Sequence, residues 1–266
     1  PLWLYLFPSV IGFTYLVRLD VALSIWAFFL FYRIQLVAGT ALGIPMEQSM
    51  GYGSRAYASH MEMGGYIVAV GYFVWSGRSY LMPTTLAFFK RQPLGRAEPI
   101  SEPWLLPCLL VGILLPSVLL HSAGASLLLC IGVVSLMGIS SIMLTYMVIA
   151  GGIMHINSSF RAFDFYHTAL GSNRINPNSL AVLAVPSAIF RTKRGFLMPH
   201  ISNAFKMAAT AKVNGKQLLM SMSLALTLSV VLTSFFFLRL VYQQGALNLQ
   251  YWTFVTAPQT PFRWLE

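Results

Sequence analysis

Two long stretches of this chain contain no Asp, Glu, Lys or Arg, and they limit what the chain can fold into. One runs for 58 residues from Pro103 to Phe160, and the other covers the 22 residues from Gln217 to Leu238. Only 9% of all residues are charged, whereas about 25% is usual in a soluble domain. Because a bilayer offers the backbone no hydrogen-bond partners, segments that cross it form helices or closed barrels, and long apolar runs form helices. The sequence therefore predicts an all-α fold, a polytopic transmembrane helical bundle.

Apolar segments of about the length that one crossing needs, roughly 20 residues, recur along the chain. We predict about six membrane-spanning helices, plus interfacial amphipathic helices, in a single integral membrane domain over residues 1–266. The six spans are expected at about 3–17, 21–38, 61–80, 104–121, 127–154 and 218–241. The first span is short and the chain opens on Pro1, so we expect this chain to be part of a longer protein.

A basic segment, residues 155–217, separates the fifth and sixth predicted spans. The part from Arg161 to Lys216 holds eight of the 17 Lys and Arg residues. Within it, the apolar run Leu180–Phe190 is about half as long as a crossing requires, which predicts a re-entrant or surface segment. The run Ile201–Val213 combines apolar residues and lysines at helical spacing, which is typical of an interfacial amphipathic helix.

The cations are distributed unequally between the two sides of the predicted bundle. If residues 78–103 and 151–216 lie on one side, alternation through six crossings places 13 of the 17 cations there. The positive-inside rule then predicts that this side is cytoplasmic. We expect the protein in the inner or plasma membrane of the cell.

The net charge of +10 is compatible with nucleic acid as well as with membrane surfaces. Since the cations lie in loops beside apolar spans, we expect anionic lipid headgroups as partners and no nucleic acid. An acidic protein, such as another membrane subunit, is the second expected partner. The candidate lipid- or partner-binding residues are Arg161, Arg191, Lys193, Arg194, Lys206 and Lys212.

Ionisable groups near membrane depth are the candidates for function in a chain of this kind. His60 and Glu62 stand where the third span begins, and His121 ends the fourth span on the same predicted side. We predict that these three residues form a polar cluster for a proton, a cation or a substrate. Simple solvation of each side chain at the interface is the alternative, and a haem held by the two histidines is a further one that no spacing demands.

Motifs of enzymes are absent from the sequence. It contains no Walker loop, no GxGxxG after a strand, no CxxC and no HExxH. Cys108 and Cys130 fall inside apolar spans, which favours packing over a disulfide or metal site. A Met-rich stretch (Met46, Met50, Met61 and Met63) allows soft-metal transport, but packing is the simpler interpretation. We therefore predict no catalytic residues and no metal, and the sequence does not specify a cofactor.

Two stretches carry a family resemblance. They are FPSVIGFTYLVRLDVALSIWAFFLFYRIQ, residues 7–35, and SNRINPNSLAVLAVPSAIFRTKRGFLMPHISNAFKMA, residues 172–208. Both resemble the C-terminal half of an uncharacterised family of large bacterial polytopic membrane proteins that is loosely similar to oligopeptide transporters. That family commonly has an acidic residue near the position of Asn203, where this chain departs from it. The resemblance implies a transporter-like origin and supplies no catalytic or binding residue.

Two functions are expected first from the sequence, and a membrane-bound enzyme comes third because no nucleophile–base pair or metal cluster is visible. The first is a transporter-like half or fragment with an unknown substrate, and the alternative is a non-catalytic structural subunit of a larger energy-converting membrane complex. Transporters usually place charged groups or broken helices near the middle of the bilayer. The 58-residue charge-free stretch argues against this arrangement for the fourth and fifth spans, so any coupling group is expected elsewhere.

Overall fold

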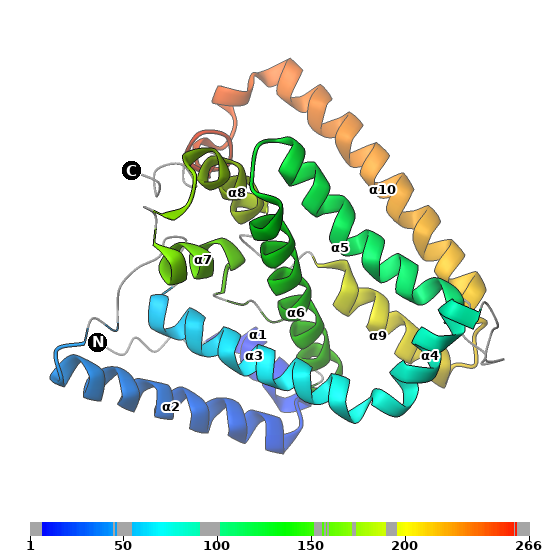
Figure 1. Cartoon of the computed structure of the whole chain (residues 1–266), viewed down its shortest axis with the longest axis horizontal. Coiled ribbons are helices and arrows are strands. Elements are labelled where there is room, and N and C mark those ends of the chain that lie inside the picture. Colours follow the sequence, from blue (N-terminus) through cyan, green and yellow to red (C-terminus); the bar gives the residue numbers. More distant parts are fainter. Residues whose placement is uncertain are drawn as a thin grey trace.

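The described part of the chain is mostly helical and contains no strand, which confirms the all-α prediction. A computed structural model describes residues 7–44, 46, 55–90, 102–151, 156, 158, 160–171, 174–189, 196–257 and 259. Within these residues the α-helices are α1 (Pro8–Leu16), α2 (Leu19–Ala41), α3 (Ala56–Ser76), α4 (Arg78–Lys90), α5 (Leu105–Ser122), α6 (Leu127–Gly151), α7 (Ala162–Leu170), α8 (Pro177–Ile189), α9 (Leu197–Thr210) and α10 (Gly215–Gln244). Figure 1 shows their arrangement.

Four of these helices, α2, α5, α6 and α10, are long and apolar enough to cross a membrane. Each begins and ends within about three residues of a span expected from the sequence. α3 is 21 residues long and therefore about 30 Å in length, but His60 and Glu62 lower its hydropathy. The described part of the first expected span is the nine-residue α1. The chain is thus an integral membrane protein by composition and helix length, and the number of six spans stays a prediction.

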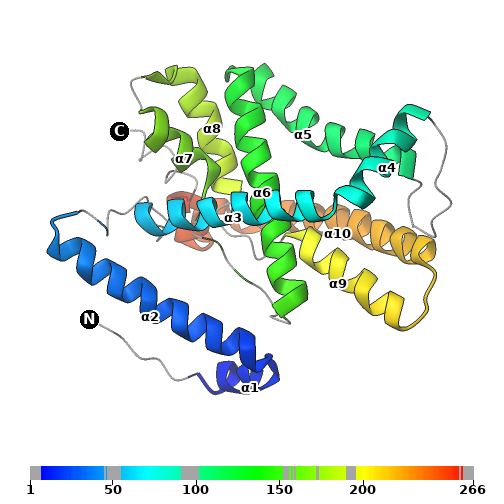
Figure 2. The ribbon, with the colours of Figure 1, turned by 60° about the horizontal axis from the view of Figure 1, so that its bottom comes forward.

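Among the described residues, α6 packs against four other helices, α5, α9, α3 and α7. It returns along α5 after a turn of four residues, 123–126. α10 packs on α9. The ring of Phe73 in α3 meets that of Tyr146 in α6, with 4.5 Å between centroids, where the two helices cross (Figure 2). Close α5–α6 packing is what so short a connection requires.

α7 packs between the parts of α3 and α6 that diverge from this crossing. On one side, the Phe165 ring lies 5.8 Å from the ring of His60 in α3. On the other side, the Tyr166 hydroxyl end lies against Gly132 in α6, where the missing side chain makes room for it. Small residues allow this kind of close approach between membrane helices.

α8 begins beside the turn that joins α5 to α6. The backbone N–H of Ser126 donates to Oγ of Ser179 over 3.1 Å, and Ser179 and Leu183 are buried. The turn at Ser126 is one end of α6, and Gly151 is the other. The chain therefore leaves α6 at Gly151, returns along it through α7 to the far end, and reverses there into α8.

This path bears on two expectations from the sequence. α8 has 13 residues, so it is too short to cross a membrane alone, as predicted for Leu180–Phe190. Residues 151–216 were expected on one side, but the structure brings one part of this segment to the opposite end of α6. The re-entrant or surface placement of Leu180–Phe190 stays a prediction, and Phe190 lies outside the described residues.

Candidate functional site

A carboxylic acid and a phenol are paired on one face of α3. The Tyr66 hydroxyl donates a hydrogen bond to Oε1 of Glu62 over 2.5 Å. The two residues are four apart, so the helix places their side chains on adjacent turns of the same face. Tyr66 is only 5% exposed, while Glu62 is half-buried. The carboxylate of Glu62 is thus held by a hydrogen bond from a buried neighbour and is not simply solvated.

Non-helical backbone from the segment before α7 covers this pair. The Ser158 hydroxyl hydrogen-bonds to the phenolic oxygen of Tyr66, and it accepts the backbone N–H of Phe160 over 3.1 Å. Ser158, Phe160 and Arg161 are all buried. Buried backbone outside a helix needs side-chain partners for its polar groups, and the Ser158 hydroxyl supplies one of them.

His60 lies near the beginning of α3, two residues before Glu62. Its Nδ1 is 2.7 Å from the carbonyl oxygen of Ala56. A carbonyl only accepts hydrogen bonds, so Nδ1 is the donor in this arrangement, and in the neutral ring Nε2 is the acceptor. Nε2 is buried and has no hydrogen-bond partner among the described residues. The ring also lines a hollow of about 350 Å³, together with Met46 and Met61.

The two methionines in this hollow were part of the Met-rich stretch in the sequence. Met46 is buried and packs against Gly39 of α2, as a packing residue does. Met63 is buried in the core, and Met50 and Glu47 lie outside the described residues. The packing interpretation is therefore the one that the described contacts of Met46 and Met63 support.

His121 does not join His60 and Glu62. Its Nδ1 is 2.8 Å from the carbonyl oxygen of Ala125, within the α5–α6 turn. In the described part of the chain, no three His, Cys, Asp or Glu residues come close enough together to hold a metal ion. The structure instead groups Glu62 with Tyr66 and Ser158, whereas the described contacts of His60 are with Ala56, with Phe165 and with the hollow beside Met46. The spacing Glu62-x-x-x-Tyr66 was a signal in the sequence for the Glu62–Tyr66 pair, whereas the contact with Ser158 depends on the tertiary fold.

The candidate lipid- or partner-binding cations occupy different environments. Arg161 is 5% exposed and lies just before α7. The Nζ of Lys206 donates to the carbonyl oxygen of Ile149 over 2.9 Å, so this cation sits at the C-terminal end of α6, where the helix dipole favours positive charge. Lys212 is exposed just after α9, with a φ of 55°. Arg191, Lys193 and Arg194 lie outside the described residues, and lipid or partner binding by the six stays a prediction.

The comparisons with known proteins give one result. No curated protein and no solved structure matches this chain. The model of a family of unknown function, DUF6785, matches residues 1–266, and the chain therefore belongs to the DUF6785 family.

Proposed function

We propose that this chain is the membrane part of an ion-coupled transporter, with Glu62, Tyr66 and His60 as its coupling site. The observation that carries the proposal is the burial of non-helical backbone, at Ser158 and Phe160, against the ionisable pair of α3. Irregular backbone at membrane depth occurs where protein encloses it or where it lines a cavity. Transporters use such breaks to hold substrates and coupling ions.

A proton is the ion that these side chains suit best. The ionised carboxylate of Glu62 accepts hydrogen bonds only, whereas the protonated form is also a donor. A hydrogen bond to a charged group contributes about 1.5–3 kcal/mol. Protonation of Glu62 therefore changes how firmly Tyr66 is held, and with it the Ser158 segment to which Tyr66 bonds. His60, two residues before Glu62 in the same helix, offers a further ionisable group close to the pair in sequence.

Reconstituted protein would test this role. Liposomes containing the purified protein and an internal pH dye would receive a mixture of di-, tri- and tetrapeptides under an imposed membrane potential. We expect peptide-dependent acidification of the lumen with the natural chain and none with Glu62→Gln. Tyr66→Phe should slow it by about tenfold or more, because one hydrogen bond to a charged group is lost.

His121→Asn is the matched control, since His121 bonds within its own turn, and it should keep the full rate. Full-rate acidification by Glu62→Gln would eliminate Glu62 as the coupling group. Peptides are the probe because of the resemblance to oligopeptide transporters, and failure of the natural chain to respond to any of them would eliminate peptides as the substrate.

A structural subunit of a larger energy-converting membrane complex is the second candidate. It is favoured by α10, a candidate span of 30 residues with no buried residue in its most apolar part. Such a surface faces lipid or a neighbouring subunit. If the chain is such a subunit, Glu62→Gln should change neither the activity nor the assembly of the complex, and native mass spectrometry of the intact protein should detect its partners.

A further inference from the structure

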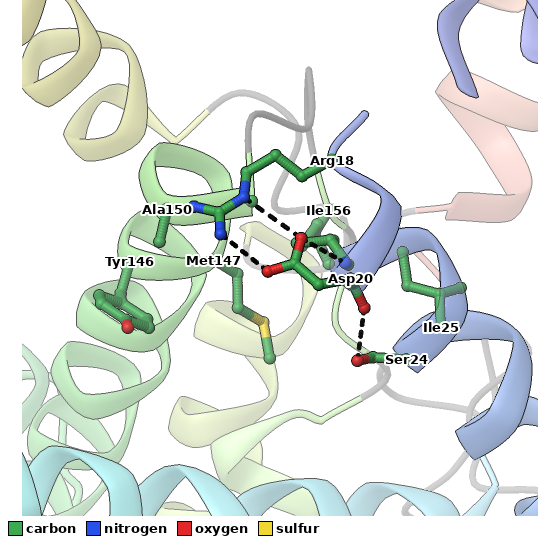
Figure 3. Close-up of a pocket in the computed structure, with 10 residues that line it drawn as sticks. Arg18, Asp20, Ser24, Ile25, Tyr146, Met147, Ala150 and Ile156 are labelled. Carbon is green, nitrogen blue, oxygen red and sulfur yellow. Dashed lines mark hydrogen bonds and ion pairs between the residues drawn. The ribbon is translucent and has the colours of Figure 1, made fainter. Parts of the chain in front are cut away.

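A cavity of about 750 Å³ separates the start of α2 from the C-terminal end of α6. Figure 3 shows its walls, with Arg18, Asp20 and Ile25 on one side and Tyr146, Met147 and Ala150 on the other. Both helices are candidate membrane spans. The cavity therefore lies where two spans end, which is the depth of lipid headgroups.

One cation and one anion stand together at the cavity. Nη2 of Arg18 is 2.8 Å from Oδ2 of Asp20, and Nε of Arg18 is 3.2 Å from Oδ1. The two side chains are 70% and 62% exposed, and such exposed ion pairs contribute little to stability. Arg18 has five N–H donors, and the described structure assigns it no polar partner besides Asp20. The pair can therefore open toward a ligand at small cost.

The remaining walls are mostly apolar. Val21 and Ile25 lie one turn apart on α2, and Met147 faces them from α6. The last turn of α6 also brings the negative end of a helix dipole to the cavity. The site thus combines Arg18 as a donor to an anion with an apolar wall. Asp20 and the C-terminal end of α6 are the two negative groups that can face a cation.

We propose that this cavity binds a phospholipid with a zwitterionic headgroup and a primary ammonium, such as phosphatidylethanolamine. Arg18 donates to the phosphate, Asp20 accepts from the ammonium, and the acyl chains lie along the apolar residues of α2 and α6. Charge complementarity identifies this occupant. An anionic lipid with no ammonium leaves Asp20 facing negative charge, and a cationic amphiphile leaves Arg18 facing positive charge.

The same chemistry separates ethanolamine from choline. A quaternary ammonium cannot donate a hydrogen bond to Asp20 and is usually held by several aromatic faces. Tyr146 is the one aromatic among the described lining residues, and its ring already packs against Phe73. The cavity therefore favours a headgroup whose nitrogen carries hydrogens.

Lipid retention by the purified protein tests the proposal. The protein would be equilibrated in micelles with equal amounts of phosphatidylethanolamine, phosphatidylglycerol and phosphatidylcholine of the same acyl chains, and retained lipid would be read by native mass spectrometry. We expect about tenfold preference for phosphatidylethanolamine, which corresponds to about 1.4 kcal/mol. Asp20→Asn should abolish its preference over phosphatidylglycerol, and Arg18→Gln should lower its retention.

Two further variants keep the test decisive. Ala150→Trp fills the cavity from an exposed position in the last turn of α6, and it should reduce retention about tenfold even if the Arg18 and Asp20 variants fold poorly. Arg239→Gln removes an exposed cation from α10, which does not line the cavity, and should change nothing.

Equal retention of the three lipids, or unchanged retention in Ala150→Trp, would overturn the proposal. So would displacement of the lipid by free O-phosphoethanolamine at the concentration at which the lipid itself competes, since the site would then recognise a soluble phosphate amine.

Discussion

The contact of α7 with α6 can be tested by a single added methyl group. At Gly132 a Cβ would lie 2.8 Å from Cζ of Tyr166 and nearer still to its hydroxyl oxygen, which is closer than atoms in proteins pack. Overpacking of this kind costs about 1–3 kcal/mol. Replacing Gly by Ala inside a helix returns up to about 1 kcal/mol of helix propensity, so the net loss for Gly132→Ala is smaller than the clash.

Gly138→Ala removes that ambiguity, because Gly138 lies in the same helix and no atom lies within 4 Å of its added Cβ. The difference in unfolding free energy between the two variants should be about 1–3 kcal/mol. Denaturant titration of the purified protein in mixed micelles measures it. In a Tyr166→Leu background the cost of Gly132→Ala should fall by a similar amount, because the atoms that clash are absent.

Equal stability of Gly132→Ala and Gly138→Ala, within about 0.5 kcal/mol, would refute a Tyr166 side chain held firmly against Gly132. The geometry assigned to the candidate site would then also be wrong, because the same short helix positions Phe165 and the Ser158 segment.

Two more predictions concern the ends of α6. After replacement of Cys108 and Cys130, cysteines at Asn178 and Ala123 should label from the same side of sealed vesicles, and a cysteine at Lys212 from the other; labelling of Asn178 together with Lys212 would contradict the placement of α8 at the α5–α6 turn. Lys206→Met should lower the unfolding free energy by about 0.3–1 kcal/mol, because it removes a cation from the C-terminal end of a helix. Lys216→Met, in the first turn of α10, should be neutral or slightly stabilising, and an equal loss in both variants would show that Lys206 does not act through α6.

The long apolar helices could be located from the sequence because hydropathy over about 20 residues is a local property. α5 and α6 begin and end near the positions expected for them, and their four-residue turn required mutual packing. α3 was harder to assign, since His60 and Glu62 lower its hydropathy while its length suits a crossing. One of these two residues, Glu62, is the one that the structure pairs with Tyr66 at the candidate site.

The Glu62–Tyr66 pair of the candidate site could also be predicted from the sequence, because it too depends on local structure. Glu62 and Tyr66 are one helical turn apart, so their pairing follows from α3 alone. His121 was grouped with Glu62 because both were expected on one side of the membrane. Two residues on the same side of the membrane share a depth but need not be neighbours within the membrane plane. The hydrogen bond of His121 to Ala125 keeps it in its own turn.

The basic segment shows why counting charges does not fix the path of the chain. The positive-inside rule weighs all cations near the membrane alike, whereas the structure buries Arg161 and joins Lys206 to the end of α6. A buried guanidinium is expensive without partners, so its burial depends on a surrounding that only the assembled helices supply. The hydrogen bond between Ser126 and Ser179, which are 53 residues apart, depends on the same assembly. It places the start of α8 at the end of α6 opposite Lys206, so a predominantly basic segment reaches both ends of one helix.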